Sequence, residues 1–168
     1  MNFALHMARA FSERVDADLQ RAHPFANERV GFLFGRSARA GVDEWLVFPS
    51  SYQPVPDELY IDEPLIGAKV NNVAVRNALQ RALSSGESCF HVHLHSPLHP
   101  GFGDLDLREQ DKLIPSFVAL NGRVPHGALV MFESGCEARA WLPGAARPVL
   151  ARRVAVVGFP LALSRRAS

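Results

Sequence analysis

The chain has 168 residues, of which 48% are hydrophobic and 21% are charged, a composition typical of one globular domain with a sizeable core. Its 18 Lys and Arg nearly balance 17 Asp and Glu, so the net charge of +1 does not indicate binding to nucleic acid or to an anionic membrane. Cys89 and Cys136 lack the spacing of a disulfide scaffold or a zinc knuckle. With no long apolar stretch near the N-terminus, we expect a cytoplasmic protein.

The hydrophobic pattern predicts a single domain over residues 1–168, with a core of about residues 20–160 and a C-terminal tail of residues 160–168. Apolar residues recur every four positions at the start of the chain, which predicts an N-terminal amphipathic helix over residues 1–20. The residues of this stripe are Phe3, Met7, Phe11, Val15 and Leu19.

Strands and helices are predicted to follow in mixed order. The predicted strands are residues 30–34, 44–48, 88–94, 128–132, 138–142 and 154–159. Helical spacing predicts helices over residues 73–83 and 106–114, with Gly86 ending the first and Pro115 close to the end of the second. Residues 50–64 are rich in Pro and acidic residues and predict a loop. This order indicates an α/β or α+β domain, a mixed sheet flanked by helices.

The most informative stretch is residues 90–106, FHVHLHSPLHPGFGDLD. On a strand, the alternating histidines His91, His93 and His95 share one face. Two histidines two positions apart lie about 7 Å from each other at Cα, close enough for both to reach one metal ion. Burying several imidazoles together is unfavourable unless something pairs with them, so we expect a functional site.

Such a metal ion needs a third protein ligand, and a carboxylate beyond the turn would supply it. The fourth tetrahedral position would then be open to water, as in catalytic zinc sites. Two registers have the same spacing. They are His91 and His93 with Asp104, and His93 and His95 with Asp106.

The second register resembles the motif of the JAMM metalloproteases, the JAB/MPN domain family. That motif has an early Glu, then His-x-His, seven residues, Ser, two residues and Asp. Glu28 in residues 27–35 (NERVGFLFG), His93, His95 and Asp106 match it. The resemblance extends from about Glu28 to Leu142 and is closest to the compact bacterial JAB proteins that accompany ubiquitin-like conjugation genes.

The resemblance implies a JAB/MPN-like (cytidine-deaminase-like) fold and a zinc-dependent isopeptidase or peptidase. His93, His95 and Asp106 would bind Zn²⁺, and Glu28 would be the general base on the zinc-bound water. The implied substrate is the bond after the C-terminus of a ubiquitin-like protein, as in deubiquitinases. Implied partners are that protein or its conjugates and the matching E1-like and E2-like conjugation enzymes.

One position departs from the family pattern. The family serine corresponds to Gly103, which has no side chain to stabilise the reaction, and loss of such a donor typically costs about 100-fold to 1,000-fold in rate. Ser96, a backbone amide near Gly101 or Gly103, or a water would have to replace it. A domain that only binds a ubiquitin-like partner is therefore one alternative.

A second alternative comes from another family. The sequence HVHLHSP also resembles the His-φ-His-φ-His-φ-φ signature of histidine-triad nucleotide hydrolases, in which φ is apolar and the middle histidine attacks phosphorus. Ser96 stands where that signature has an apolar residue. If His93 and His95 are the ligands, His91 either supports them through a contact or is simply a buried neighbour. Asp104 is interpreted as capping the loop.

Overall fold

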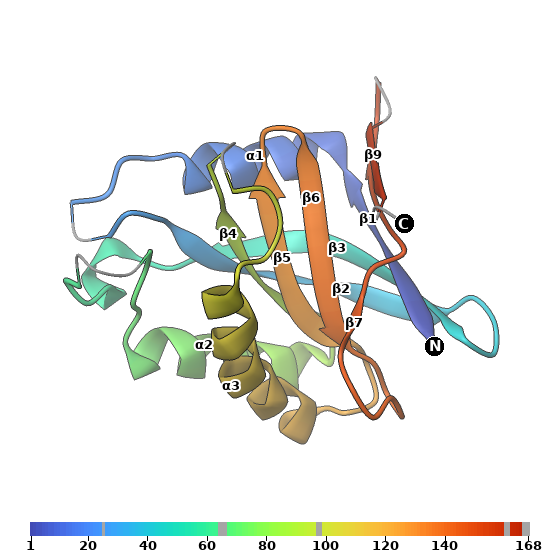
Figure 1. Cartoon of the computed structure of the whole chain (residues 1–168). Coiled ribbons are helices and arrows are strands. Elements are labelled where there is room, and N and C mark those ends of the chain that lie inside the picture. The colour runs from blue at the N-terminus through green and yellow to red at the C-terminus, as the bar shows by residue number, and fades with distance from the viewer. Residues whose placement is uncertain (25, 64–66, 97–98, 160–161, 166–168) are drawn as a thin grey trace.

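The computed structural model describes residues 1–168 except 25, 64–66, 97–98, 160–161 and 166–168, and within these residues nine strands form one mixed sheet (Figure 1). In chain order the elements are β1 (Asn2–Ala8), α1 (Arg9–Leu19), β2 (Val30–Arg39), β3 (Glu44–Pro54), η1 (Asp57–Leu59), α2 (Asn72–Ser85), β4 (Ser88–Leu94), α3 (Asp104–Leu120), β5 (His126–Phe132), β6 (Gly135–Trp141), β7 (Val149–Leu150), β8 (Arg153–Val157) and β9 (Ala162–Arg165).

The strand order is β7-β6-β5-β4-β2-β3-β1-β8-β9. β1 runs parallel to β3 and β8, and β4 runs parallel to β5, whereas the other neighbours are antiparallel. The sheet curls enough for β9 to meet β6, where the Cys136 amide donates to Ser164 Oγ at 3.1 Å. The predicted α/β domain with a mixed sheet and flanking helices is confirmed at this level.

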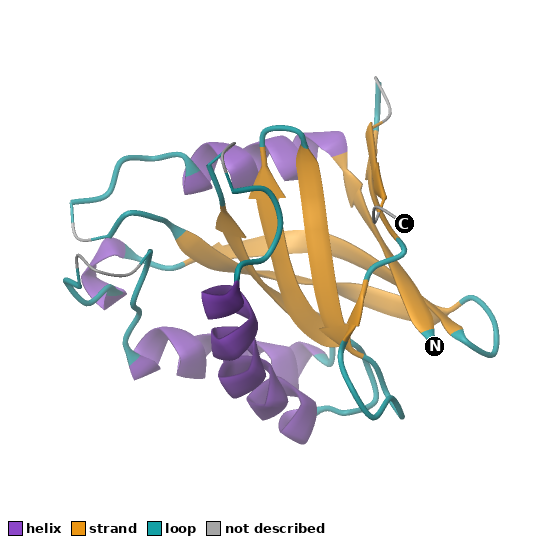
Figure 2. Cartoon of the chain, in the orientation of Figure 1, coloured by secondary structure: helices purple, strands orange, loops and turns teal. Residues whose placement is uncertain are grey.

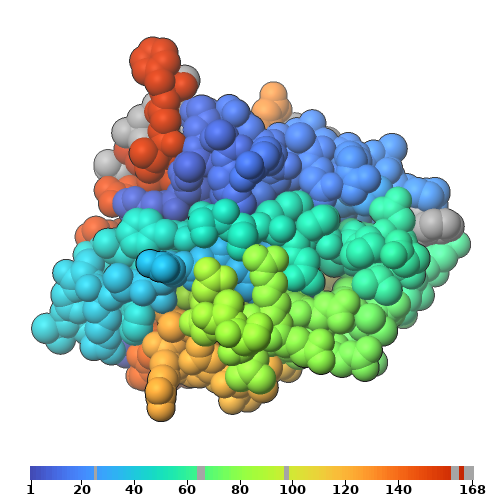
Figure 3. All heavy atoms as spheres, turned by 180° about the vertical axis from the view of Figure 1, so that it is seen from behind, coloured from blue at the N-terminus to red at the C-terminus, as the bar shows by residue number. Residues whose placement is uncertain are grey.

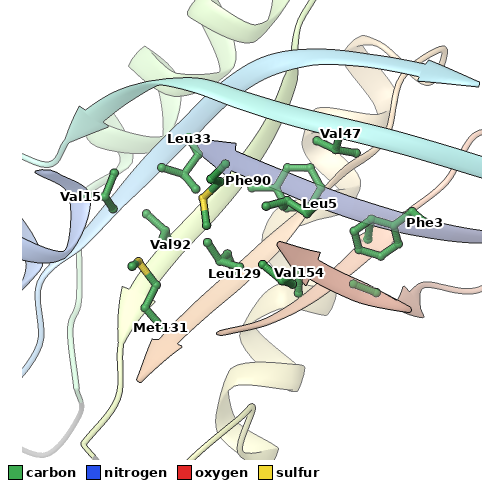
Figure 4. Packing of buried hydrophobic residues seen from close by; sticks show 14 of the residues in the cluster. Phe3, Leu5, Val15, Leu33, Val47, Phe90, Val92, Leu129, Met131 and Val154 are labelled. Atoms are coloured by element: carbon green, nitrogen blue, oxygen red, sulfur yellow. The ribbon is translucent and has the colours of Figure 1, made fainter. Parts of the chain in front are cut away.

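Helices cover both faces of the sheet (Figure 2). On one face, α1 packs Phe11, Val15 and Leu19 against apolar side chains of the strands, a cluster shown in part in Figure 4. On the opposite face, α2 and α3 pack against the alternate side chains of β2 and β4. This alternation assigns Phe90 and Val92 of β4 to the α1 side and leaves its histidines on the side of α3.

The prediction of one helix over residues 1–20 is wrong for its first half. Residues 2–8 form β1, which lies between β3 and β8, with Phe3, Ala4, Leu5 and Met7 buried. A spacing of four residues fits a strand as well as a helix, since it is a multiple of the strand period of two. The predicted helix is present only from Arg9 onward.

Other boundaries differ from the predictions. The helix predicted over residues 106–114 spans Asp104–Leu120, because the exposed Pro115 is accommodated inside it. The loop predicted over residues 50–64 contains the end of β3 and the short helix η1. β9 lies in the predicted tail, of which residues 160–161 and 166–168 are outside the described part, and β7 was not predicted. The strand over Ser88–Leu94 and the stop at Gly86 are confirmed.

No helix in the described part of the chain combines the length and apolar character needed to cross a bilayer. Seen from behind, the segment that contains β3 crosses the middle of the molecule, and the C-terminal hairpin of β8 and β9 projects at one end (Figure 3). Phe159, in the turn of this hairpin, is 98% exposed.

Phe3→Ala should destabilise the protein by about 3–5 kcal/mol, because it removes a fully buried ring from a central strand. Phe159→Ala is the matched control, since its ring is exposed, and it should change the free energy of unfolding by less than about 0.5 kcal/mol. Urea unfolding of both variants checks this. Equal effects would mean that the N-terminal strand is not part of the core.

The buried His126 joins three elements. Its Nδ1 accepts from the Cys89 amide of β4 at 3.1 Å, and its Nε2 donates to the carbonyl of Asn121, after α3, at 3.0 Å. Burial lowers the pKa of His126 from its ordinary 6.5, although the hydrogen bond to Asn121 acts in the opposite direction. The neutral ring therefore stabilises the fold.

A lowered pKa in the folded state means that this stabilisation is complete above pH 6.5 and is lost as the pH falls towards the folded pKa. His126→Leu should be less stable than the native protein by about 1–3 kcal/mol at pH 8. The difference between the two proteins should narrow as the pH is lowered to 5, because only the native ring must be protonated. Chemical unfolding at several pH values measures it, and a constant difference would contradict the argument.

Candidate metal centre

The register of β2 against β4 brings the two halves of the site together. Val30 lies opposite His93 in this antiparallel pair, and the ladder ends there. Extending the same register by two residues beyond the end of each strand places Glu28 opposite His95. Because side chains alternate, Glu28 leaves on the same face as Val30, and His95 on the same face as His93.

Three of these side chains form a group that could hold a metal ion. One ligand atom from each of Glu28, His93 and His95 can be chosen so that all three lie within 4.8 Å of one another. The Nε2 atoms of the two histidines are 3.1 Å apart. His93 is only 4% exposed, whereas Glu28 and His95 are partly exposed and line a cleft.

Asp106 completes the cluster from α3. Its Oδ1 lies 3.4 Å from His93 Nε2 and its Oδ2 lies 3.4 Å from His95 Nε2. As the third residue of the helix, it also accepts the Gly103 amide at 2.7 Å, which fixes the carboxylate at the helix start. Burial favours the neutral acid, but His93, the Gly103 amide and His95 outweigh it and hold the pKa of Asp106 below its usual value.

Backbone carbonyls determine the orientation of His95. Its Nδ1 lies 2.9 Å from the Gly101 oxygen and 3.1 Å from the His99 oxygen. A carbonyl can only accept, so Nδ1 carries a hydrogen, and in the neutral ring the Nε2 lone pair then faces His93 and Asp106. This is the tautomer that a metal ligand requires.

Glu28 packs against Gly67, and the next residue, Arg29, is anchored in the protein. Its amide donates to the Gly67 carbonyl at 2.9 Å, and a Cβ on residue 67 would lie only 2.6 Å from Glu28 Oε2. The next residue, Arg29, is 3% exposed and donates to Asp57 and to the carbonyls of residues 21 and 22. The hydrogen bond with Asp57 is the main reason that the pKa of Arg29 is raised.

The remaining candidate residues lie outside the cluster. The ring of His91 packs against Phe32 and His93, and burial, followed by the nearby His93, lowers its pKa to about 3. Its neutral ring is thus a packing neighbour of the site. Asp104 is the exposed first residue of α3, and no capping bond from it is observed among the described residues, so its predicted capping role is not supported. The register with His93, His95 and Asp106 is the one that converges.

Gly103, at the position of the serine in the motif that this stretch resembles, is the residue before the first turn of α3. Its amide is already engaged with Asp106, and the Phe102 amide with Glu137 at 2.9 Å. Neither amide is therefore free to replace the serine.

A cleft of about 1550 Å³ opens beside the cluster. Glu28, His95 and Asp106 line it together with α1, the turn between β5 and β6, and part of the β8–β9 hairpin. An extended chain could therefore reach the polar groups from the surface. No local pattern in the sequence indicates the roles of Gly67, Arg29 and Glu137, because each depends on contacts between segments far apart in the chain.

Comparison with known proteins adds no family assignment. No protein-family profile matches the sequence, and no curated protein matches it significantly. Functional inference therefore depends on the geometry of Glu28, His93, His95 and Asp106 and on the resemblance of the motif they form.

Proposed function

We propose that this chain is a zinc-dependent peptidase or isopeptidase of the JAMM type, with a JAB/MPN-like fold, that cleaves the bond after the C-terminus of a ubiquitin-like protein. The observation that carries the proposal is the convergence of His93, His95 and Asp106 at distances suited to a single ion, with Glu28 beside them.

The distances between these donors fit a tetrahedral zinc site. With metal-ligand bonds of about 2.0–2.1 Å, the ligand atoms of a tetrahedron lie about 3.3–3.4 Å apart. The Nε2 atoms of His93 and His95 are 3.1 Å apart, and each lies 3.4 Å from a different oxygen of Asp106, which is close to this separation. Two imidazoles and one carboxylate are also a donor set that zinc uses in catalytic sites.

Glu28 has a different role from the three ligands in this proposal. When bound, zinc would act as a Lewis acid that polarises the scissile carbonyl and acidifies a water. Glu28 accepts the proton of the attacking water and returns it to the leaving amine. Its position in the cleft, against Gly67, gives it access to both.

The substrate class rests on the resemblance and on the form of the cleft. The C-terminal tail of a ubiquitin-like protein is extended and narrow, so it could enter a cleft whose polar end holds Glu28, His95 and Asp106. The cleft is large enough for several residues of such a tail. Recognition through the folded part of the substrate would involve the surfaces around it.

The histidine-triad alternative fits the geometry less well. In that reading His93, the middle histidine, would attack phosphorus, but it is 4% exposed and its Nε2 faces His95 and Asp106. Hydrolysis unaffected by chelators would favour this alternative. Tight binding of a ubiquitin-like protein without turnover would favour the domain that only binds.

Asp106→Ala should weaken zinc binding by more than about 100-fold, since residues that merely support ligands already contribute about 10–100-fold.

Glu28→Gln should retain zinc and lose about 10²–10⁴-fold in cleavage of a ubiquitin-like fusion, because it removes the base but not a ligand. Elemental mass spectrometry measures the zinc bound by both variants, and a gel-based assay measures cleavage by Glu28→Gln.

Asp104→Ala is the matched control for Asp106→Ala, because it removes an exposed aspartate from the same helical turn. It should leave zinc affinity unchanged. A native protein that binds no zinc would overturn the proposal. Loss of zinc in Glu28→Gln as complete as in Asp106→Ala would instead make Glu28 a ligand.

Gly67→Ala should lower cleavage by up to about 100-fold without loss of zinc. The new Cβ would lie 2.6 Å from Glu28 Oε2, so the carboxylate must move, and a displacement of about 1 Å can have an effect of this size. Gly41→Ala is the control, because a Cβ there meets nothing within 4 Å. Unchanged kcat in Gly67→Ala would show that the position of Glu28 is not set by Gly67.

A further inference from the structure

We infer that Glu137 on β6 is a positioning residue that acts on His95 through the peptide bond between Gly101 and Phe102. The inference deepens the proposed function and rests on it in one respect, namely that His95 is a metal ligand. Glu137 does not touch the cluster itself, and no sequence motif marks it.

The sheet directs Glu137 toward the site. His93 on β4 pairs with Val130 on β5, and Val130 pairs with Glu137 on β6. Residues in register on neighbouring strands point to the same face, so Glu137 leaves the sheet on the side of His93. The loop between β4 and α3 lies over this face, and Glu137 Oε2 accepts the Phe102 amide at 2.9 Å.

That amide belongs to the same peptide unit as the Gly101 carbonyl. The carbonyl lies 2.9 Å from His95 Nδ1, so one planar peptide is held at both ends, by Glu137 at its N–H and by His95 at its oxygen. Fixing the N–H end fixes the direction of the carbonyl. A carboxylate on the N–H also polarises the peptide and strengthens the bond that its oxygen accepts.

Gly101 is shaped to this arrangement. Its φ is +80°, a backbone conformation that residues other than glycine rarely adopt. A Cβ there would lie 2.7 Å from Glu137 Oε2. The loop thus packs directly on the carboxylate. Through this contact Glu137 holds Nδ1–H of His95 in place and leaves Nε2 as the lone-pair donor, as supporting residues do for metal-bound histidines.

Glu137→Ala should lower zinc affinity by about 10–100-fold, the usual effect of losing a partner that orients a ligand. Glu137→Gln keeps an acceptor for the Phe102 amide but loses the charge, so its affinity should lie between those of Glu137→Ala and the native protein. Competition with a chromogenic chelator measures zinc affinity in the full-length chain. Equal affinities in all three proteins would overturn the inference.

Glu133→Ala and Glu133→Gln are matched controls, because they alter an exposed carboxylate on the turn between β5 and β6 that also lines the cleft. Both should bind zinc as the native protein does. Should Glu137→Ala fail to fold, the comparison of Glu137→Gln with Glu133→Gln decides, and equal affinity of those two variants would contradict the inference.

A second readout does not depend on metal or activity. In metal-free protein, nitrogen NMR of the histidine rings should show His95 protonated at Nδ1 in the native chain and a smaller share of that tautomer in Glu137→Ala, in which the His99 carbonyl remains beside Nδ1. A native protein that binds no zinc would refute the proposed function, yet the NMR comparison would still test the peptide relay. Zinc binding with unchanged tautomers in Glu137→Ala would refute the relay alone.

Discussion

The pairing of β2 with β4 is the constraint on which the candidate metal centre depends. With Val30 opposite His93 at the end of the ladder, the segments that extend beyond it bring Glu28 close to His93 and His95. A slip of one residue would reverse the faces of every side chain on the slipped strand. Glu28 would then be separated by the sheet from the two histidines. The site therefore requires one register, and the packing of the sheet has to enforce it.

Packing on both faces enforces that register. Phe90 and Val92 of β4 are buried against the α1 side, and Phe32 of β2 is buried against Phe117 of α3 on the other, so a shifted strand would expose apolar rings. The same contact positions α3. Once Phe117 is seated on Phe32, the first turn of the helix reaches the end of β4, and Asp106 meets the histidines. Packing of the core thus positions the Asp106 carboxylate as well as fixing the register of the strands.

Local sequence patterns predict part of the fold and of the candidate site but not all of either. The histidine strand, the helix after it and the choice of Asp106 follow from spacing along one short stretch and from the resemblance of that stretch. The N-terminal strand also has the spacing of a helix because Phe3 and Met7 satisfy both periods, and only the neighbours β3 and β8 decide between them. Gly67 and Glu137 act through segments distant in sequence, so no periodicity could reveal them.

The two histidines are held by different means. His95 has a polar anchor, since its Nδ1 faces two carbonyls of the following loop. His93 Nδ1 is buried and has no hydrogen-bond partner among the described residues. Its ring is instead enclosed by the rings of His91, His95 and Phe102. Orientation of His93 thus depends on shape and that of His95 on the loop, so a change in the loop would release one imidazole while the sheet retained the other.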